Sequence, residues 1–258
     1  MSTPNPYAAP RAPVSDADAA PRNFIPTGRA VPAARGWNWI AEGFELFRRQ
    51  PGPWIALAVI GFLIFVGLAL VPVIGSLASM VLATVFAAGV LIGCREEDAG
   101  RPLLISHLFA GFRERFGTLV SIGLIYLGIT LAVALVAGLV SGAGMWTLLS
   151  DGADAAAIAG AGLTLLLALL VMMALMLPVF MAMWFAPALA VFHEQGPAEA
   201  MKSSFIACLR NIMPFLFYSV IVLLLAIAAS IPLGLGWLVL GPTLAGSLYA
   251  GYRDVFFD

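Results

Sequence analysis

Six stretches of the chain are long, apolar and free of Lys, Arg, Asp and Glu: residues 54–71, 73–94, 117–141, 161–191, 213–231 and 233–252. A helix of about 20 residues crosses the ~30 Å hydrocarbon layer of a bilayer. Because every backbone polar group inside lipid has to be hydrogen-bonded within the protein, such stretches are expected to be helices. The sequence therefore predicts an all-α fold, a polytopic membrane helical bundle with six transmembrane helices.

The composition agrees with a membrane class. Hydrophobic residues make up 62% of the chain and charged residues 10%, whereas a soluble domain carries roughly a quarter charged residues. The few cations border the apolar stretches, so no separate basic surface remains for nucleic acid. Residues 1–35 are rich in Pro, Ala and Arg and are predicted to be a disordered tail without a signal peptide, followed by a membrane domain over residues 36–258.

The positions of the cations predict the topology. With six crossings, all 13 Lys and Arg fall on one side of the membrane: Arg11, Arg22, Arg29, Arg35, Arg48, Arg49, Arg95, Arg101, Arg113, Arg115, Lys202, Arg210 and Arg253. The sizeable loop on the other side, residues 141–160, contains Asp151 and Asp154 but no cation. By the positive-inside rule, the cationic side is cytoplasmic, and it carries both termini.

Recurring sequence signals indicate an internal threefold repeat. Amphipathic segments at residues 37–49, 102–115 and 197–210 each lead into a pair of apolar stretches. A cation followed by an acid closes each pair, at Arg95-Glu96, His193-Glu194 and Arg253-Asp254. We expect three parallel units of interfacial helix plus helical hairpin, over residues 36–98, 99–195 and 196–258, around a rough three-fold axis along the membrane normal.

The amphipathic segments are the predicted contact surface. In the middle one, Ile105, Leu108, Phe109 and Phe112 follow α-helical spacing and would form a single apolar stripe. Such a helix either lies along the lipid headgroups or packs on the protein's own membrane helices, and both arrangements remain open. Five arginines near these segments are candidate headgroup contacts: Arg48, Arg49, Arg113, Arg115 and Arg210.

Small residues recur along the second and sixth stretches. Close backbone approach drives helix association in lipid, so these positions are predicted to be helix-packing residues, or alternatively the face of a homo-oligomer: Gly75, Ser79, Ala83, Ala87, Gly89, Gly93, Gly241 and Ala245. The fourth stretch contains Pro178 and Pro187, which predict a kink or break before the helix ends.

Reactive chemistry is not predicted. No ionisable residue lies inside a stretch, which argues against proton-coupled transport, and no catalytic motif is present. Cys94, His107, His193 and Cys208 lack the close spacing of a zinc site, and the two cysteines are expected to be reduced. We therefore expect no catalytic, cofactor-binding or metal-binding residues. The run Glu96-Glu97-Asp98 is expected to form solvated ion pairs, and Trp37, Trp39 and Trp54 are expected to be interface anchors.

Several short motifs resemble those of a known family: Gly36-Trp37-x-Trp39, Gly43-Phe44-x-Leu46-Phe47, Pro51 with Trp54, Val71-Pro72-x-Ile74-Gly75, Gly93-Cys94-Arg95 and residues 107–112. From Gly36 onward the chain resembles an uncharacterised family of proteobacterial inner-membrane proteins with six predicted helices. The resemblance implies an inner-membrane location and a helical fold. The family has no assigned activity, so no functional residue is carried over.

Two functions are expected from these features. The first is a non-enzymatic membrane protein that organises membrane lipids, partner proteins or copies of itself through its interfacial helices and arginines. The second is a transporter or channel for a small or apolar solute, with a pore on the three-fold axis. A polar central cavity would favour transport, and a closely packed apolar centre would favour the first function.

Overall fold

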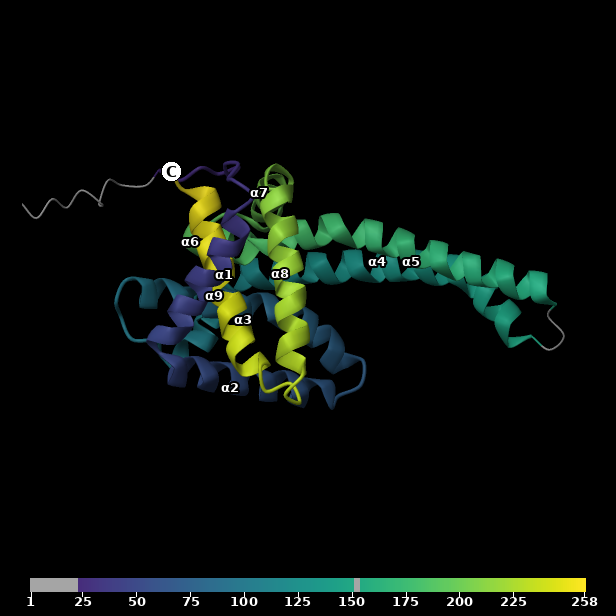
Figure 1. Cartoon of the computed structure of the whole chain (residues 1–258), viewed down its shortest axis with the longest axis horizontal. Helices are drawn as coiled ribbons and strands as arrows, with labels where there is room; N and C mark the ends of the chain where they lie inside the picture. Colours follow the sequence, from purple (N-terminus) through teal and green to yellow (C-terminus); the bar gives the residue numbers. More distant parts are fainter. Residues whose placement is uncertain (1–22, 151–153) are drawn as a thin grey trace, which may run out of the picture.

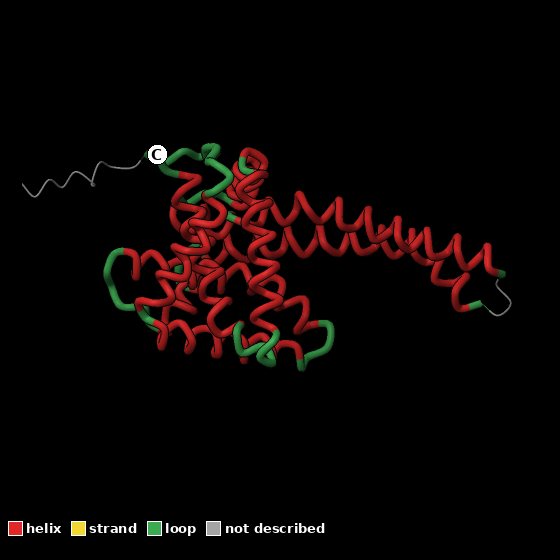
Figure 2. The backbone as a smooth tube through the Cα atoms, viewed as in Figure 1, coloured by secondary structure: helices red, strands yellow, loops and turns green. Residues whose placement is uncertain are grey.

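The structure, a computed structural model, describes residues 23–150 and 154–258, which form helices joined by short turns (Figures 1 and 2). Within these ranges the β-type pairing is one isolated bridge between Phe24 and Phe257. Residues 1–22 of the predicted tail, and Asp151 of the predicted outer loop, lie outside the described residues. The elements are α1 (Arg35–Arg49), α2 (Pro51–Ala69), α3 (Ile74–Asp98), the 3₁₀ helix η1 (Ile105–Phe112), α4 (Phe116–Leu149), α5 (Ala155–Trp184), α6 (Ala186–Phe192), α7 (Pro197–Arg210), α8 (Ile212–Ser230) and α9 (Trp237–Phe256).

Five segments of the described chain are long and apolar enough to cross a membrane: Pro51–Ala69, Ile74–Asp98, Phe116–Gly142, Ala155–Phe192 and Ile212–Ser230. They coincide with the first five apolar stretches of the sequence. The sixth stretch forms α9, which is not among the five. The molecule is therefore an all-helical, multi-pass membrane protein.

The long helices form three antiparallel hairpins, α2–α3, α4–α5 and α8–α9 (Figure 1). The α4–α5 hairpin is the longest and projects away from the other helices. The turns of the other two hairpins contain no charged residue and pass through a positive φ, at Val73 in the first and at Leu233 and Gly234 in the third. Asp154 begins α5, because its side chain accepts a hydrogen bond from the amide of Ala157 (2.7 Å).

The predicted break in the fourth stretch is found at Phe185, between α5 and α6. Pro187 lies in the first turn of α6, where a proline is tolerated. Ser204 of α7 pairs the backbone groups that the break leaves free. Its hydroxyl accepts from the amide of Phe185 (2.9 Å) and donates to the carbonyl oxygen of Met181 (2.7 Å). The buried serine thus compensates for the interrupted helix.

The short elements pack on the long ones in a regular order. α1 lies against α9, η1 against α3, and α7 against α5. Thus η1 and α7 each contact the second helix of the preceding hairpin. The first short helix, α1, contacts the second helix of the last hairpin, so the order is cyclic. Phe24 to Val31, within the predicted tail, also contact α9 and α7, so the packed domain begins earlier than residue 36.

The middle short element is not the predicted α-helix. Residues 105–112 form a 3₁₀ helix, which has three residues per turn. Leu108 and Gly111, three residues apart, are therefore buried, whereas Ile105, Phe109 and Phe112 are more exposed. The prediction of a single apolar stripe at α-helical spacing was therefore wrong for this segment. The segment also lies close to the backbone of α3, since a Cβ added to Gly89 would be 2.6 Å from the carbonyl oxygen of Leu108.

Candidate functional site

Charged side chains of α1, α3, α9 and the linkers contact one another at one end of the hairpins, which we call the rim. Its ion pairs are Arg29–Asp254, Arg35–Asp254, Arg35–Glu42, Arg101–Glu96, Arg115–Glu194 and Arg253–Asp98. Arg95 lies over the ring of Phe192, 4.5 Å from its centroid. The acids of the rim thus tie together elements that are far apart in the sequence.

Asp254 is one anchor of the rim. Its Oδ2 accepts from Arg35 Nε (2.6 Å) and from the indole nitrogen of Trp39 (2.9 Å). The hydrogen bond and charge of Asp254 raise the pKa of Arg35 above its ordinary value, against a smaller effect of burial. Trp39 is 1% exposed. The expectation of an interface anchor is therefore wrong for Trp39, since its indole N–H is used inside the protein.

A second tryptophan also donates its indole N–H to a carboxylate. The indole nitrogen of Trp54 donates to Glu97 Oε2 (2.8 Å), and both residues are 2% exposed. Glu97 Oε1 is buried and has no hydrogen-bond partner among the described residues. Glu97 is therefore not part of a solvated ion-pair run, as the sequence suggested. Trp37, in contrast, is 56% exposed, as an interface anchor would be.

Three side chains just before α2, α4 and α8 hold the linker that leads into another short helix, and we call these contacts the clamps. Gln50 accepts from the amide of Leu103 (3.1 Å) and lies 3.5 Å from the carbonyl oxygen of Arg101. Asn211 accepts from the amide of Val31 (2.9 Å) and donates to the carbonyl oxygen of Arg29 (2.8 Å).

Arg115 makes the third clamp. Its Nη2 donates to the carbonyl oxygen of Glu194 (2.6 Å). The three clamps thus join the end of each short helix to the linker before another one, from α1 to η1, from η1 to α7 and from α7 back to α1. Sequence reasoning missed Gln50 and Asn211, although each directly follows the arginine that ends a short helix, a shared position that an alignment of the units would have shown.

The five candidate headgroup arginines have different environments. Arg48 is exposed and pairs with Glu45 at 3.1 Å within α1. Arg49 and Arg113 are exposed and make no hydrogen bond or ion pair within the described part of the chain. Arg115 forms a clamp, and Arg210 donates to the carbonyl oxygen of Gly28 (2.7 Å). Arg48, Arg49 and Arg113 therefore remain available to headgroups, whereas the other two arginines hold the protein together.

The candidate helix-packing residues also divide into groups. A Cβ added to Gly75 would meet the carbonyl oxygen of Leu68, and one added to Gly89 or Gly93 would meet η1 or the linker before it. The hydroxyl of Ser79 donates to Gly75 within α3. The remaining four line an apolar groove: Ala83, Ala87, Gly241 and Ala245.

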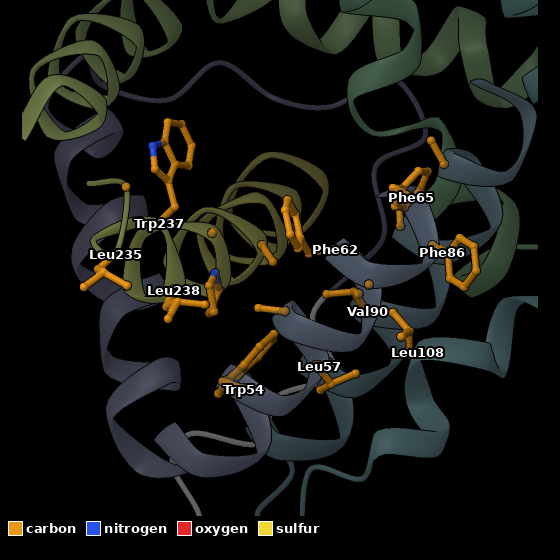
Figure 3. A pocket seen from close by; sticks show the side chains of 18 of the residues that line it. Trp54, Leu57, Phe62, Phe65, Phe86, Val90, Leu108, Leu235, Trp237 and Leu238 are labelled. Carbon is orange, nitrogen blue, oxygen red and sulfur yellow. The ribbon is translucent and has the colours of Figure 1, made fainter. Parts of the chain in front are cut away.

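This groove lies between α2, α3 and α9, with η1 at one end, and has a volume of about 620 Å³ (Figure 3). Apolar side chains dominate its walls, including Leu57, Phe62 and Phe86 (Figure 3). Trp54 lies at its rim end. The hollow between the first and third hairpins is thus suited to hydrocarbon.

The cysteines and histidines are separate from one another. Cys94 and Cys208 are free and buried, and burial raises the pKa of the Cys208 thiol to about 12. His107 Nδ1 accepts from the amide of Leu104 (3.2 Å) at the start of η1. His193 stacks on Phe24 at 3.4 Å between ring centroids. Within the described residues, no three His, Cys, Asp or Glu are grouped to hold a metal ion.

Apolar spanning helices and a charged rim define a multi-pass helical membrane protein. Over 229 residues the chain is 31% identical to "Probable inner membrane protein BTH_II0599" of Burkholderia thailandensis, covering 85% of this chain and 82% of that protein. The chain belongs to the same family, which confirms the resemblance to an uncharacterised inner-membrane family. No protein-family model matches the chain. No solved structure matches it.

Proposed function

We propose that this protein is a non-enzymatic membrane protein that organises lipids or partner proteins at its rim. The observation that carries the proposal is the position of Arg48, Arg49 and Arg113, which are exposed next to the short helices. Exposed arginines near a bilayer surface attract anionic headgroups by about 1 kcal/mol each. Arg49 and Arg113 make no ion pair with any described residue, and Arg48 pairs with the exposed Glu45 of its own helix, so these three side chains are accessible to headgroups.

The architecture that we propose for this function has six crossings and three repeated units. The cyclic order of the short helices and the three clamps support a rough three-fold arrangement. α9 would be the sixth crossing, as the antiparallel partner of α8. Its polar residues Thr243 and Ser247 are buried within the protein, so they do not oppose a position in the membrane. In this arrangement both termini and the rim face the cytoplasm.

Transport of a small solute is the alternative function. It requires a polar path between the hairpins, lined by Ser, Thr or Tyr. The groove between the first and third hairpins has mainly apolar walls instead. This favours the lipid-organising function over a pore for polar solutes.

The test of the proposed function is lipid co-purification. Replacing Arg48, Arg49 and Arg113 together by Gln is expected to reduce the anionic lipid retained through purification in mild detergent, because three favourable contacts are removed. The matched control replaces the exposed acids Glu114 and Glu199 by Gln, because neither pairs with one of the three arginines. Retention of the same amount of anionic lipid by the arginine variant would contradict the proposal.

A further inference from the structure

Two hollows of different polarity share a wall next to α2. The first is the apolar groove between α2, α3 and α9. The second, at the rim, has a volume of about 410 Å³ and is lined by Arg49, Gln50, Glu97, Gly100, Arg101 and Pro102. Trp54 lines the groove, and its indole N–H donates to Glu97, which lines the rim pocket. One tryptophan–glutamate pair thus lies where a hydrocarbon-like space adjoins a charged one.

The rim pocket contains an acceptor without a donor. Glu97 is 2% exposed, and its Oε1 has no hydrogen-bond partner of normal geometry in the described part of the chain, although the side chain of Gln50 lies near this carboxyl group. A buried carboxylate oxygen left unpaired costs more free energy than a neutral group in the same position. The pocket is therefore complementary to a ligand that brings a positively charged hydrogen-bond donor.

The same pocket also contains cations. Arg49 makes no ion pair or hydrogen bond with any described residue, and its charge acts on Glu97. Arg101 pairs with Glu96 through two guanidinium nitrogens, on the exposed side of the pocket. An anionic group beside Arg49 would therefore give this arginine an ion-pair partner. Phosphate is suitable, since guanidinium groups bind it through several hydrogen bonds.

We propose that the two hollows together bind one phospholipid whose headgroup carries both a phosphate and a primary ammonium group, as in phosphatidylethanolamine. The phosphate lies beside Arg49, the ammonium group donates to Glu97, and one acyl chain lies in the groove past Trp54. The inference rests on the proposed function and names the lipid class and the position at which it binds. The groove volume of 620 Å³ is within the range of about 300–1,000 Å³ that is typical of small-molecule sites.

A variant that changes the groove distinguishes a bound lipid, whose acyl chain would occupy the groove, from a soluble ligand of the same headgroup chemistry. Gly61 lies on the groove wall, and a Cβ added to it would have no atom within 4 Å. Gly61→Trp therefore fills the groove without displacing the backbone. If an acyl chain contributes to binding, this variant weakens binding although it leaves Arg49 and Glu97 unchanged.

The experiment measures lipid binding to the detergent-purified full-length protein by native mass spectrometry. The probes are phosphatidylethanolamine and phosphatidylcholine with identical oleoyl chains, because the quaternary ammonium group of phosphatidylcholine has no hydrogen to donate. We expect the wild type to prefer phosphatidylethanolamine by about tenfold, which corresponds to about 1.4 kcal/mol. Glu97→Gln, which retains an oxygen for Trp54, is expected to reduce this ratio to about one. Arg49→Gln is expected to weaken binding of both lipids several-fold. The control Lys202→Gln, at an exposed cation that does not line the pocket, is expected to change neither.

Two outcomes would overturn the inference. One is an equal affinity of the wild type for the two lipids, or a ratio unchanged by Glu97→Gln. The other is a Gly61→Trp variant with wild-type binding, or displacement of the lipid by soluble glycerophosphoethanolamine at a similar concentration, because either result makes the groove irrelevant. Failure of this inference is distinct from failure of the proposed function, which is judged by anionic lipid retained by the triple arginine variant.

Discussion

Gly43 of α1 and Gly246 of α9 lie directly against each other, since a Cβ added to Gly246 would be 2.8 Å from the Cα of Gly43. A Cβ added to Gly43 would meet the carbonyl oxygen of Thr243 and the amide of Ser247. The two helices thus approach through their backbones, as is usual where small residues drive packing in membranes. This contact fixes the first short helix on the last long one.

A methyl group at this contact should separate the helices. Gly43→Ala is expected to destabilise the protein by about 1–3 kcal/mol, because the obstructing atoms are backbone and are not free to rotate away. Thermal unfolding in detergent measures the loss. Gly241→Ala on α9 is the control, since its added Cβ has no neighbour within 4 Å and a helical Gly→Ala change is favourable by about 1 kcal/mol. Equal stabilities of the two variants would contradict the close approach.

The Asn211 clamp should hold the segment before α1. Asn211 is 0% exposed, and Asn211→Ala leaves the amide of Val31 and the carbonyl oxygen of Arg29 without their partner. Both groups are partly buried, and a fully buried polar group left unpaired costs about 1–3 kcal/mol, so the loss is at most of this size for each. Hydrogen exchange of residues 23–34 is expected to accelerate in this variant. Ser121→Ala, which removes a hydrogen bond within α4, is the control and should leave exchange of that segment unchanged.

His193 should make stability depend on pH. Burial lowers the pKa of His193 below its ordinary value, and its ring contacts Phe24 and the hydroxyl of Tyr252 (2.6 Å). The unfolded chain therefore takes up a proton first as the pH falls below about 6.5, and the folded state loses stability down to the lower folded-state pKa. Above about pH 6.5 the histidine is neutral in both states and contributes no pH dependence.

The measurement is the unfolding temperature in detergent between pH 5 and 8. His193→Gln is expected to show a smaller decrease toward low pH than the wild type. His107→Gln, which changes the other histidine, is expected to retain that decrease. A wild-type profile in the His193 variant would show that another group is responsible.

The six-crossing topology predicts where reporter proteins fused to the chain will be found. Reporters at the N-terminus and after Asp258 are expected in the cytoplasm, and one inserted after Leu149 on the opposite side, because α4 ends at the far end of its hairpin (Figure 1). A C-terminal reporter on the opposite side from the N-terminal one would instead indicate an odd number of crossings. It would then exclude α9 as a membrane helix.

The spanning helices and their order could be predicted because hydropathy and charge act locally along the sequence. The first five apolar stretches became helices within a few residues of their expected bounds. The short segment 105–112 could not be predicted in the same way. Its close contact with the backbone of Gly89 forms only when η1 packs on α3, so no pattern within residues 105–112 indicates it.

The buried polar pairs of the rim could not be predicted from the sequence either. Glu97 sits in an acidic run and Trp54 at the start of an apolar stretch, so each is typical of an exposed boundary position. Only the packing of α2 on α3 brings them together at 2.8 Å. The role of Asn211 could not be predicted either, because a side-chain amide after a helix end is usually hydrated. Its two backbone partners lie about 180 residues earlier in the sequence.

The clamps have a consequence for the order of assembly during synthesis. Asn211 and the last turn of α9 hold residues 24–31, with the amide of Ile25 bonded to the carbonyl oxygen of Phe256 (2.8 Å). The earliest packed part of the chain therefore finds its partners only after nearly all of the protein has left the ribosome. The first two hairpins are therefore synthesised before residues 24–31 can form these contacts, and the last turn of α9 completes them.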